Sequence, residues 1–281
     1  MDDQPIADEV GDWTATKLRI LSGYALAYSK VFTGTKKGRL KHIYVDGFAG
    51  SGIDRMRSSG DFISGSPLQV LKIQPPFTEY HFVDLDNAKI EQLKELAPDR
   101  PEVHIYEGDC NEILLREVFP RIRYEDFRRG LCFLDPYGLH LSWEVIKKAG
   151  EMQSMEILIN FPIMDMNREA LWRDPTNVTA EQRERLDKFW GDESWVHAAY
   201  TTEADLFGLP EKTRNEDVVQ AFRKRLKDVA KFKYVPEAVA MKNSTGSVLY
   251  YLLFASQNET GNRIMSYVFD KYRGEGARGG H

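Results

Sequence analysis

Short apolar segments rich in β-forming residues alternate with helical segments over the first 160 residues of this chain. The five apolar segments cover residues 42–45, 80–83, 103–106, 131–134 and 156–160. A first helix is expected over Trp13–Phe32, and later helices should begin near Pro67, Asn87, Asn111 and Ser142. Strands separated by helices of this length form a parallel sheet with helices on both faces. The alternation therefore predicts an α/β fold.

The regular alternation ends after the fifth strand. Residues 163–213 are rich in charge and in tryptophan, and we expect them to form a helical insertion that recognises a substrate or a partner. An Asn-Ser-Thr-Gly turn further on separates two β-rich segments, which predicts an antiparallel hairpin. The elements expected in this part are a helix at 216–232, strands at 233–241 and 247–255, and a last helix at 259–272.

These patterns divide the chain into a core and its additions. Five parallel strands and a closing hairpin give the seven-stranded, Rossmann-like sheet of class I methyltransferases. The divisions expected are a flexible N-terminus (1–12), a ligand-binding core (13–162), the insertion (163–213), the C-terminal part of the core (214–273) and a flexible tail (274–281).

Composition narrows the class of protein. Apolar residues make up 42% of the 281 residues and charged residues 29%, as in ordinary globular domains. We find no secretory signal and no apolar run long enough to cross a membrane, so we expect a cytoplasmic protein without a membrane partner. The two cysteines, Cys110 and Cys132, form no Cys-x-x-Cys pair and read as small buried residues. We therefore expect no metal site.

Charge is unevenly distributed along the chain. The net charge is −5, which does not favour polyanions. Residues 116–129 nevertheless hold five arginines against three acids, and residues 221–233 hold six basic residues against Asp228 alone. Each segment is either a solvated helix face or a surface that follows a phosphate backbone.

A glycine-rich segment follows the first strand of the predicted sheet. It reads Asp46-Gly47-Phe48-Ala49-Gly50-Ser51-Gly52. Glycines allow a sharp turn and a close approach of the backbone to a ligand, and ligands of such folds lie at this edge of the sheet. The spacing differs from the Gly-x-Gly-x-x-Gly of dinucleotide-binding proteins. Because the acidic residue suits a cationic ligand, the segment favours S-adenosylmethionine, with Asp46 and Gly50 near its methionine part.

Acidic residues also follow the next three strands. Asp84, with Leu85 beside it, is placed to accept the ribose hydroxyls, as in nucleotide-binding α/β folds. Asp109 is placed to accept the adenine amine, while the backbone of Cys110 meets a ring nitrogen. Asp135 follows the fourth strand. Any one of these acids could cap a helix, but four at consecutive strand ends predict one adenosyl site.

The motifs also carry a resemblance. Asp-Gly-Phe-Ala-Gly-Ser-Gly (46–52), Gly-Ser-Pro (65–67), His-Phe-Val-Asp-Leu-Asp (81–86) and Phe-Leu-Asp-Pro-Tyr-Gly (133–138) resemble those of the bacterial three-Cys-motif partner proteins. That family is regarded as methyltransferase-like and is named after a neighbouring protein of radical-SAM type. The resemblance implies a fold that binds S-adenosylmethionine and a possible protein partner of that type.

The segment Asp135-Pro136-Tyr137-Gly138 is the best indication of a substrate. It is similar to the Asp-Pro-Pro-Tyr of nucleobase amino-methyltransferases and to the Asp-Pro-Phe-Gly of enzymes that methylate a guanine amine in tRNA. In those enzymes the acid and the proline carbonyl accept hydrogen bonds from an exocyclic amine, and the aromatic ring stacks on the base. The second proline is missing here, and a proline-terminated strand with a core tyrosine would also explain the segment.

We therefore expect a methyltransferase that acts on a nucleobase amine in RNA or DNA, with Asp135, Pro136 and Tyr137 orienting the acceptor. The alternatives are a methyltransferase of protein or small-molecule amines and a binding module or sensor without transfer activity. Residues 53–65 form a long segment after the glycine motif. They are expected to form a mobile flap, in which Arg55 and Arg57 reach phosphate or substrate, or else a plain surface loop.

Overall fold

A seven-stranded mixed sheet forms the centre of the protein in this computed structural model, which describes residues 4–34, 40–97, 99–169, 171–172, 177–204 and 210–276. The strands lie in the order β11 (Val239–Lys242), β12 (Val248–Ala255), β8 (Met155–Phe161), β7 (Arg128–Leu134), β2 (Lys41–Asp46), β5 (Glu79–Asp84) and β6 (Val103–Glu107). Strands β8, β7, β2, β5 and β6 are parallel to one another, and β12 is antiparallel to β8 and β11. The predicted α/β class, the five parallel strands and the hairpin are confirmed.

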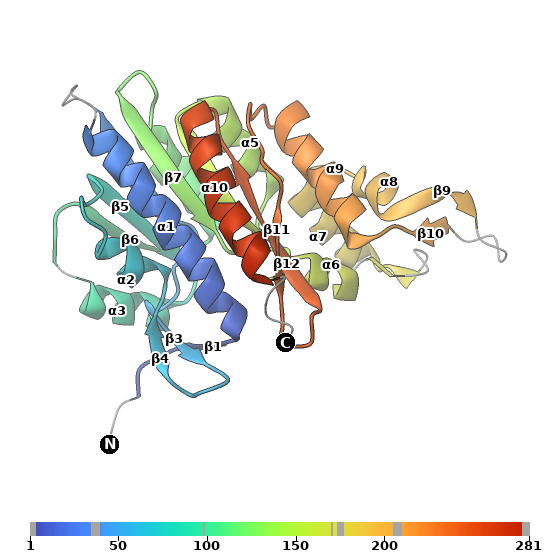
Figure 1. Cartoon of the computed structure of the whole chain (residues 1–281), viewed down its shortest axis with the longest axis horizontal. Coiled ribbons are helices and arrows are strands. Elements are labelled where there is room, and N and C mark those ends of the chain that lie inside the picture. Colours follow the sequence, from blue (N-terminus) through green and yellow to red (C-terminus); the bar gives the residue numbers. More distant parts are fainter. Residues whose placement is uncertain are drawn as a thin grey trace.

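Helices cover both faces of this sheet because its central strands are apolar on both sides. Every residue of β8, for example, is buried. One face carries α1 (Asp12–Gly34), α2 (Ser66–Leu71), α3 (Asn87–Leu96) and α10 (Glu259–Gly276). Helices α1 and α10 lie side by side there (Figure 1). The other face carries α4 (Cys110–Ile113), the short η1 (Leu114–Val118) and η2 (Phe119–Arg121), α5 (Trp143–Met152) and α9 (Asn215–Asp228).

The segment after β8, for which a helical insertion at residues 163–213 was predicted, contains strands as well as helices. It contains α6 (Ile163–Glu169), α7 (Ala180–Trp190), α8 (Trp195–Ala199), β9 (Tyr200–Ala204) and β10 (Pro210–Lys212). Strands β9 and β10 form an antiparallel pair at one side of the molecule (Figure 1). Two of its tryptophans, Trp190 and Trp195, are buried in the core that α5 and α9 share, so the insertion packs against the sheet domain.

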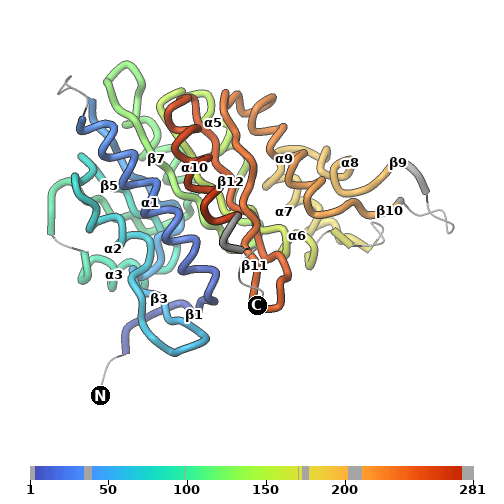
Figure 2. The backbone as a smooth tube through the Cα atoms, viewed as in Figure 1, coloured from blue at the N-terminus to red at the C-terminus, as the bar shows by residue number. Residues whose placement is uncertain are grey.

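The expectation of a flexible N-terminus at residues 1–12 is wrong for the part that the structure describes. Residues Asp8–Val10 form β1, which pairs in parallel with β3 (Ile53–Met56). The N–H and C=O of Ile6 bond the side chain of Gln92 at 2.6 and 2.7 Å. Backbone hydrogen bonds therefore order a segment that lacks any hydrophobic period. Figure 2 shows this segment passing beside β3.

Residues 53–65 form neither of the two structures expected for them, a mobile flap or a plain surface loop. They form a β-hairpin of β3 and β4 (Phe62–Ser64). Arg55 bonds the carbonyl oxygen of Gly60 in its own hairpin at 3.3 Å, and Arg57 lies 4.0 Å from Glu9. At the other end of the chain α10 continues to Gly276, beyond the predicted start of the tail, and residues 277–281 lie outside the described residues.

Two glycines in helices offer a matched test of this packing. A Cβ atom at Gly150 in α5 would lie 1.8 Å from the carbonyl oxygen of Ala230, whereas one at Gly23 in α1 would meet nothing within 4 Å. We expect Gly150→Ala to lower the free energy of unfolding by about 1–3 kcal/mol or more, because the backbone must move. Gly23→Ala should raise that free energy by roughly 0.5–1 kcal/mol. Urea unfolding measures both, and equal effects of the two variants would contradict the packing described.

Candidate functional site

A cavity of about 270 Å³ lies where the carboxyl ends of the parallel strands meet. Three segments that the sequence singled out line it together. They are Phe48, Ala49 and Gly50 from the turn after β2, Asp84 from the end of β5, and Asp135, Pro136, Tyr137 and Gly138 after β7. The fold thus brings the ends of three different strands to one wall, as the position of parallel strands in such a sheet requires.

Asp46 lies beneath this cavity and not in its wall. Its carboxylate is fully buried and accepts hydrogen bonds from the N–H of Phe48 at 3.3 Å and from the hydroxyls of Tyr44 and Ser66. Burial raises the pKa of Asp46 to about 7 despite these bonds. Asp46 therefore fixes the shape of the glycine-rich turn from below.

The glycines of the turn have separate steric reasons. Gly50 and Gly52 have φ angles of +64° and +84°, which glycine adopts without strain. A Cβ at Gly47 would lie 2.8 Å from the sulfur of Cys110, so the turn sits tightly on that buried cysteine. Cys110 and Cys132 are both free and buried, as predicted.

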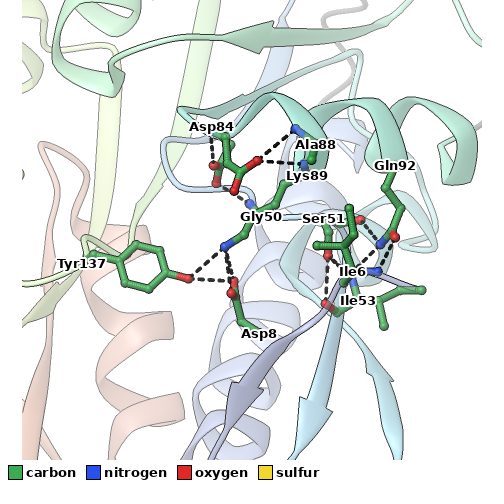
Figure 3. Close-up of polar contacts among 11 residues, drawn as sticks. Ile6, Asp8, Gly50, Ser51, Ile53, Asp84, Ala88, Lys89, Gln92 and Tyr137 are labelled. Atoms are coloured by element: carbon green, nitrogen blue, oxygen red, sulfur yellow. Dashed lines mark hydrogen bonds and ion pairs between the residues drawn. The ribbon is translucent and has the colours of Figure 1, made fainter. Parts of the chain in front are cut away.

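Asp84 holds the glycine-rich turn against β5. One carboxylate oxygen accepts the N–H of Gly50 at 2.8 Å, and the other accepts the N–H of Asp86 at 3.0 Å (Figure 3). Each oxygen can accept a further hydrogen bond, and Asp84 lines the cavity. The residue therefore sets the position of the turn and can still accept a hydroxyl group of a ligand.

The structure does not bring the third strand end to the cavity wall. Asp109 caps α4 by accepting the N–H groups of Asn111 at 2.8 Å and Glu112 at 3.1 Å. Neither Asp109 nor Cys110 lines the cavity, and Leu85 is 72% exposed beside it. Helix capping accounts for Asp109, and its contact with an adenine ring stays a prediction.

Asp135 belongs to a polar network that the sequence did not reveal. Lys17 of α1 forms an ion pair with one carboxylate oxygen, and the amide of Asn160 donates to the other at 2.6 Å. Lys17 is almost completely buried although it is charged, and its ammonium lies 5.6 Å from the ring centre of Tyr250. All four residues line the cavity. The helical period of α1 predicted its apolar face but did not distinguish a buried lysine beside it.

The N-terminal segment closes the other side of the cavity. Asp8 of β1 accepts hydrogen bonds from Tyr137 at 2.6 Å and from Lys89 at 2.6 and 2.8 Å (Figure 3). The ammonium of Lys89 also lies 5.2 Å from the ring centre of Tyr137. Burial and the bond to Asp8 raise the pKa of Tyr137, so its hydroxyl stays protonated and donates. The orientation of Tyr137 is therefore set by two residues, Asp8 and Lys89, that sequence reasoning did not select.

The cavity wall is acidic. The carboxylates that line it belong to Asp8, Glu9, Asp54, Asp84, Asp135 and Asp165, whereas Lys17 is the one basic residue among its described lining residues. Such a wall attracts a cationic ligand and repels phosphate.

The two basic segments lie away from this cavity. Residues 116–129 lead into the start of β7, and the C-terminal half of α9 lies toward the same edge of the sheet, opposite the cavity. Several of these residues serve the fold. Arg128 pairs with Glu79, Arg223 bonds the carbonyls of Val235 and Pro236, and Arg225 pairs with Asp192. Structural roles therefore account for part of each segment.

In the described part of the chain, no group of three or more histidine, cysteine, aspartate or glutamate side chains is placed to hold a metal ion. None of the helices in that part is both long and apolar enough to cross a membrane.

Comparison with known proteins supports the fold. The chain matches no protein-family model, and no curated protein is close enough in sequence to count as a relative. Among solved structures it is similar to LPL1258 from Legionella pneumophila, assigned to the family DUF519, with a TM-score of 0.53, 10% identity and 91% of each chain covered. The comparison supports a Rossmann-like α/β fold with a seven-stranded mixed sheet.

Two structures that are less similar to this chain than LPL1258 were solved with a bound ligand. The N-methyltransferase NodS from Bradyrhizobium japonicum, in complex with S-adenosylhomocysteine, has a TM-score of 0.41 and 11% identity over 92% of this chain and 90% of its own. Fibrillarin from Aeropyrum pernix, with bound S-adenosylmethionine, has a TM-score of 0.38 and 11% identity over 84% and 76%. At these values they say nothing further of this chain, and the resemblance to the three-Cys-motif partner proteins rests on the motifs alone.

The pKa of Asp46 predicts a pH dependence of stability. An aspartate in the unfolded chain has a pKa of about 3.9, so the folded form holds its proton more tightly. This contribution to stability is fully present below pH 4 and is lost progressively as the pH rises to 7. Relative to Asp46→Asn, the wild type should lose up to about 1.4 kcal/mol of unfolding free energy per pH unit in that window. Urea unfolding at pH 5 and 7 tests this, with the exposed Asp61→Asn as control; parallel pH dependences of wild type and Asp46→Asn would contradict it.

Proposed function

We propose that this chain is an S-adenosylmethionine-dependent N-methyltransferase that acts on an exocyclic amine of a nucleobase in RNA or DNA. One observation carries the proposal. The glycine-rich turn, Asp84 and the Asp135-Pro136-Tyr137 segment come from three separate strand ends and line the same cavity. A cofactor and an acceptor bound there would lie in contact, which is the first requirement for direct transfer between them.

The residues present fit the cofactor. Gly50 has a positive φ and its N–H is fixed by Asp84, so the backbone can approach a ligand without interference from a Cβ atom. Asp84 has oxygen lone pairs left for the ribose hydroxyls. The acidic wall complements the ammonium and sulfonium groups. S-adenosylmethionine, when bound, supplies the methyl group.

Asp135, Pro136 and Tyr137 would orient the acceptor. The proline carbonyl and the carboxylate accept hydrogen bonds from an amine, and the ring of Tyr137, 59% exposed, offers a face on which a base can stack. Asp8 and Lys89 hold that ring in place. A base would have to leave its helix or loop to reach this cavity.

A second candidate has an observation of its own. The acidic wall and the distant basic segments favour an amine of a protein or a small molecule over a polyanion. The resemblance to the three-Cys-motif partner proteins adds a third reading, in which the chain binds S-adenosylmethionine for a partner of radical-SAM type and transfers nothing.

Incubation with methyl-labelled S-adenosylmethionine separates these readings. The purified chain is mixed with RNA, DNA, protein and small-molecule fractions of a cell extract, and the labelled fraction is identified. Label in RNA or DNA supports the proposal. Label in protein or small molecules supports the second candidate, and cofactor binding without any label supports the binding module.

Two aspartates should give opposite phenotypes in this assay. Asp135→Ala should abolish labelling and leave the dissociation constant of S-adenosylhomocysteine within a few-fold of wild type, because it removes a contact to the acceptor. Asp84→Ala should weaken that binding by tenfold or more, because the ribose loses its acceptor and the turn loses its support. Calorimetry measures the binding, and unchanged turnover of Asp135→Ala would remove this residue from the acceptor side.

A further inference from the structure

Five of the six carboxylates in the cavity wall have partners within the described residues. Asp8 pairs with Lys89, Asp135 with Lys17, and Asp84 with two backbone N–H groups. Glu9 and Asp165 lie within 4.0 Å of Arg57 and Arg168. The carboxylate of Asp54, on β3, accepts no hydrogen bond and forms no ion pair within the described residues.

Asp54 lies close to other charged groups but has no ion-pair partner among the described residues. It is the direct register partner of Asp8 in the parallel pair of β1 and β3, an arrangement of like charges that costs stability. The charged groups around it are Lys17 of α1, Lys89 of α3, Asp8 and Asp135. Burial, with Asp8 and Asp135, raises the pKa of Asp54 to about 6 although the two lysines lower it. A carboxylate of this kind can exchange a proton near neutral pH.

Two buried polar atoms beside Asp135 also lack a partner among the described residues. The amide oxygen of Asn160 and the hydroxyl of Tyr250 form no hydrogen bond to that part of the chain, although the two residues are only 8% and 7% exposed and line the cavity. The bond from the amide nitrogen of Asn160 to Asp135 fixes which end of the amide is free. An unpaired buried polar atom costs about 1–3 kcal/mol, and such atoms at a cavity wall mark a place for a ligand.

Sheet geometry places these groups on one face. Asn160 lies opposite Leu252 in the antiparallel pair of β8 and β12, and Tyr250 is two residues before Leu252. Side chains at alternate positions of a strand share a face, so Asn160 and Tyr250 both point toward the face that α1 covers. Lys17 comes from α1 itself, and its bond to Asp135 places that residue there too.

We propose that Asn160 and Asp54 form the amine subsite of this cavity, in which Asn160 accepts one N–H of the acceptor and Asp54 takes up the proton that the nitrogen loses. As the nitrogen–carbon bond forms and the sulfur–carbon bond breaks, the pair of electrons of that bond stays on sulfur, and the proton moves from nitrogen to Asp54. Asp135, which bonds Lys17 and Asn160, holds Asn160 in position and keeps its proposed contact with the amine. This rests on the proposed function and adds a proton acceptor to it.

The same groups indicate the chemistry of the acceptor. The amide oxygen of Asn160 calls for an N–H donor, and the hydroxyl of Tyr250 can donate to a nearby acceptor atom. A planar heterocycle with an exocyclic amine beside a ring nitrogen offers both. A simple protonated alkylamine offers only donors and would leave the hydroxyl of Tyr250 without an acceptor.

The test uses the full chain, unmodified RNA transcribed in vitro, unmodified amplified DNA and a lysine-rich peptide as acceptors. The wild type should show a rise of kcat with pH at an apparent pKa near 6, and Asp54→Asn should remove this rise and lower kcat by about 100-fold or more. Asp54→Glu should retain that rise. Asn160→Ala and Tyr250→Phe should raise KM for the acceptor tenfold or more, and all variants should bind S-adenosylhomocysteine within a few-fold of wild type.

Two controls make the outcome decisive. Asp61→Asn removes an exposed carboxylate from the same hairpin and should leave kcat and its pH profile unchanged. Carbon-13 NMR of the aspartate carboxyls, compared with Asp54→Asn, should show Asp54 titrating near pH 6 in the complex with S-adenosylhomocysteine. Full activity of Asp54→Asn with an unchanged pH profile would overturn the subsite and leave the proposed function standing. Cofactor binding without transfer to any of the three acceptors would overturn both.

Discussion

The parallel hydrogen bonding of β2 between β5 and β7 is the constraint on which the site depends. Parallel strands must all leave the sheet at the same edge, so the segments after them meet there whatever their distance in sequence. The turn after β2 then lies against Asp84 of β5, and the segment after β7 lies beside it. The buried carboxylate of Asp46 supports the turn from below, because it accepts the N–H of Phe48.

The alternation of apolar and helical segments was enough to predict the sheet, because the central strands are buried on both faces and are therefore mostly apolar. The same signal could not find β1. This strand has only three residues, of which two are acidic. Backbone hydrogen bonds hold it to a hairpin that exists only in the folded chain. Part of the site could not be predicted from the sequence for a related reason. Lys17, Asp54 and Tyr250 have no motif around them, and their roles arise from the face and the edge to which the fold brings them.

Several charged residues of this cavity lie where they lower the stability of the fold. Asp8 faces Asp54 across two paired strands, and Lys17 is buried with Asp135 as its ion-pair partner. Desolvation of such groups costs several kcal/mol each, and apolar residues of similar shape would stabilise the fold at least as well. Conflicts of this kind in an otherwise consistent fold collect at functional sites. Here they coincide with the cavity where the strand ends meet.

The electrostatics of the site also decide how an acceptor can be held. Phosphate groups near an acidic wall would be repelled, and the exposed lysines of the segment after α9 lie at the opposite edge of the sheet. If the acceptor is a base, as proposed, its affinity would then come from stacking on Tyr137 and from hydrogen bonds in the cavity, and not from neutralised phosphates. Binding of this kind depends weakly on salt, because few counterions are released. A polyanionic substrate would therefore reach the cavity with its base alone, while its backbone stays outside the acidic wall.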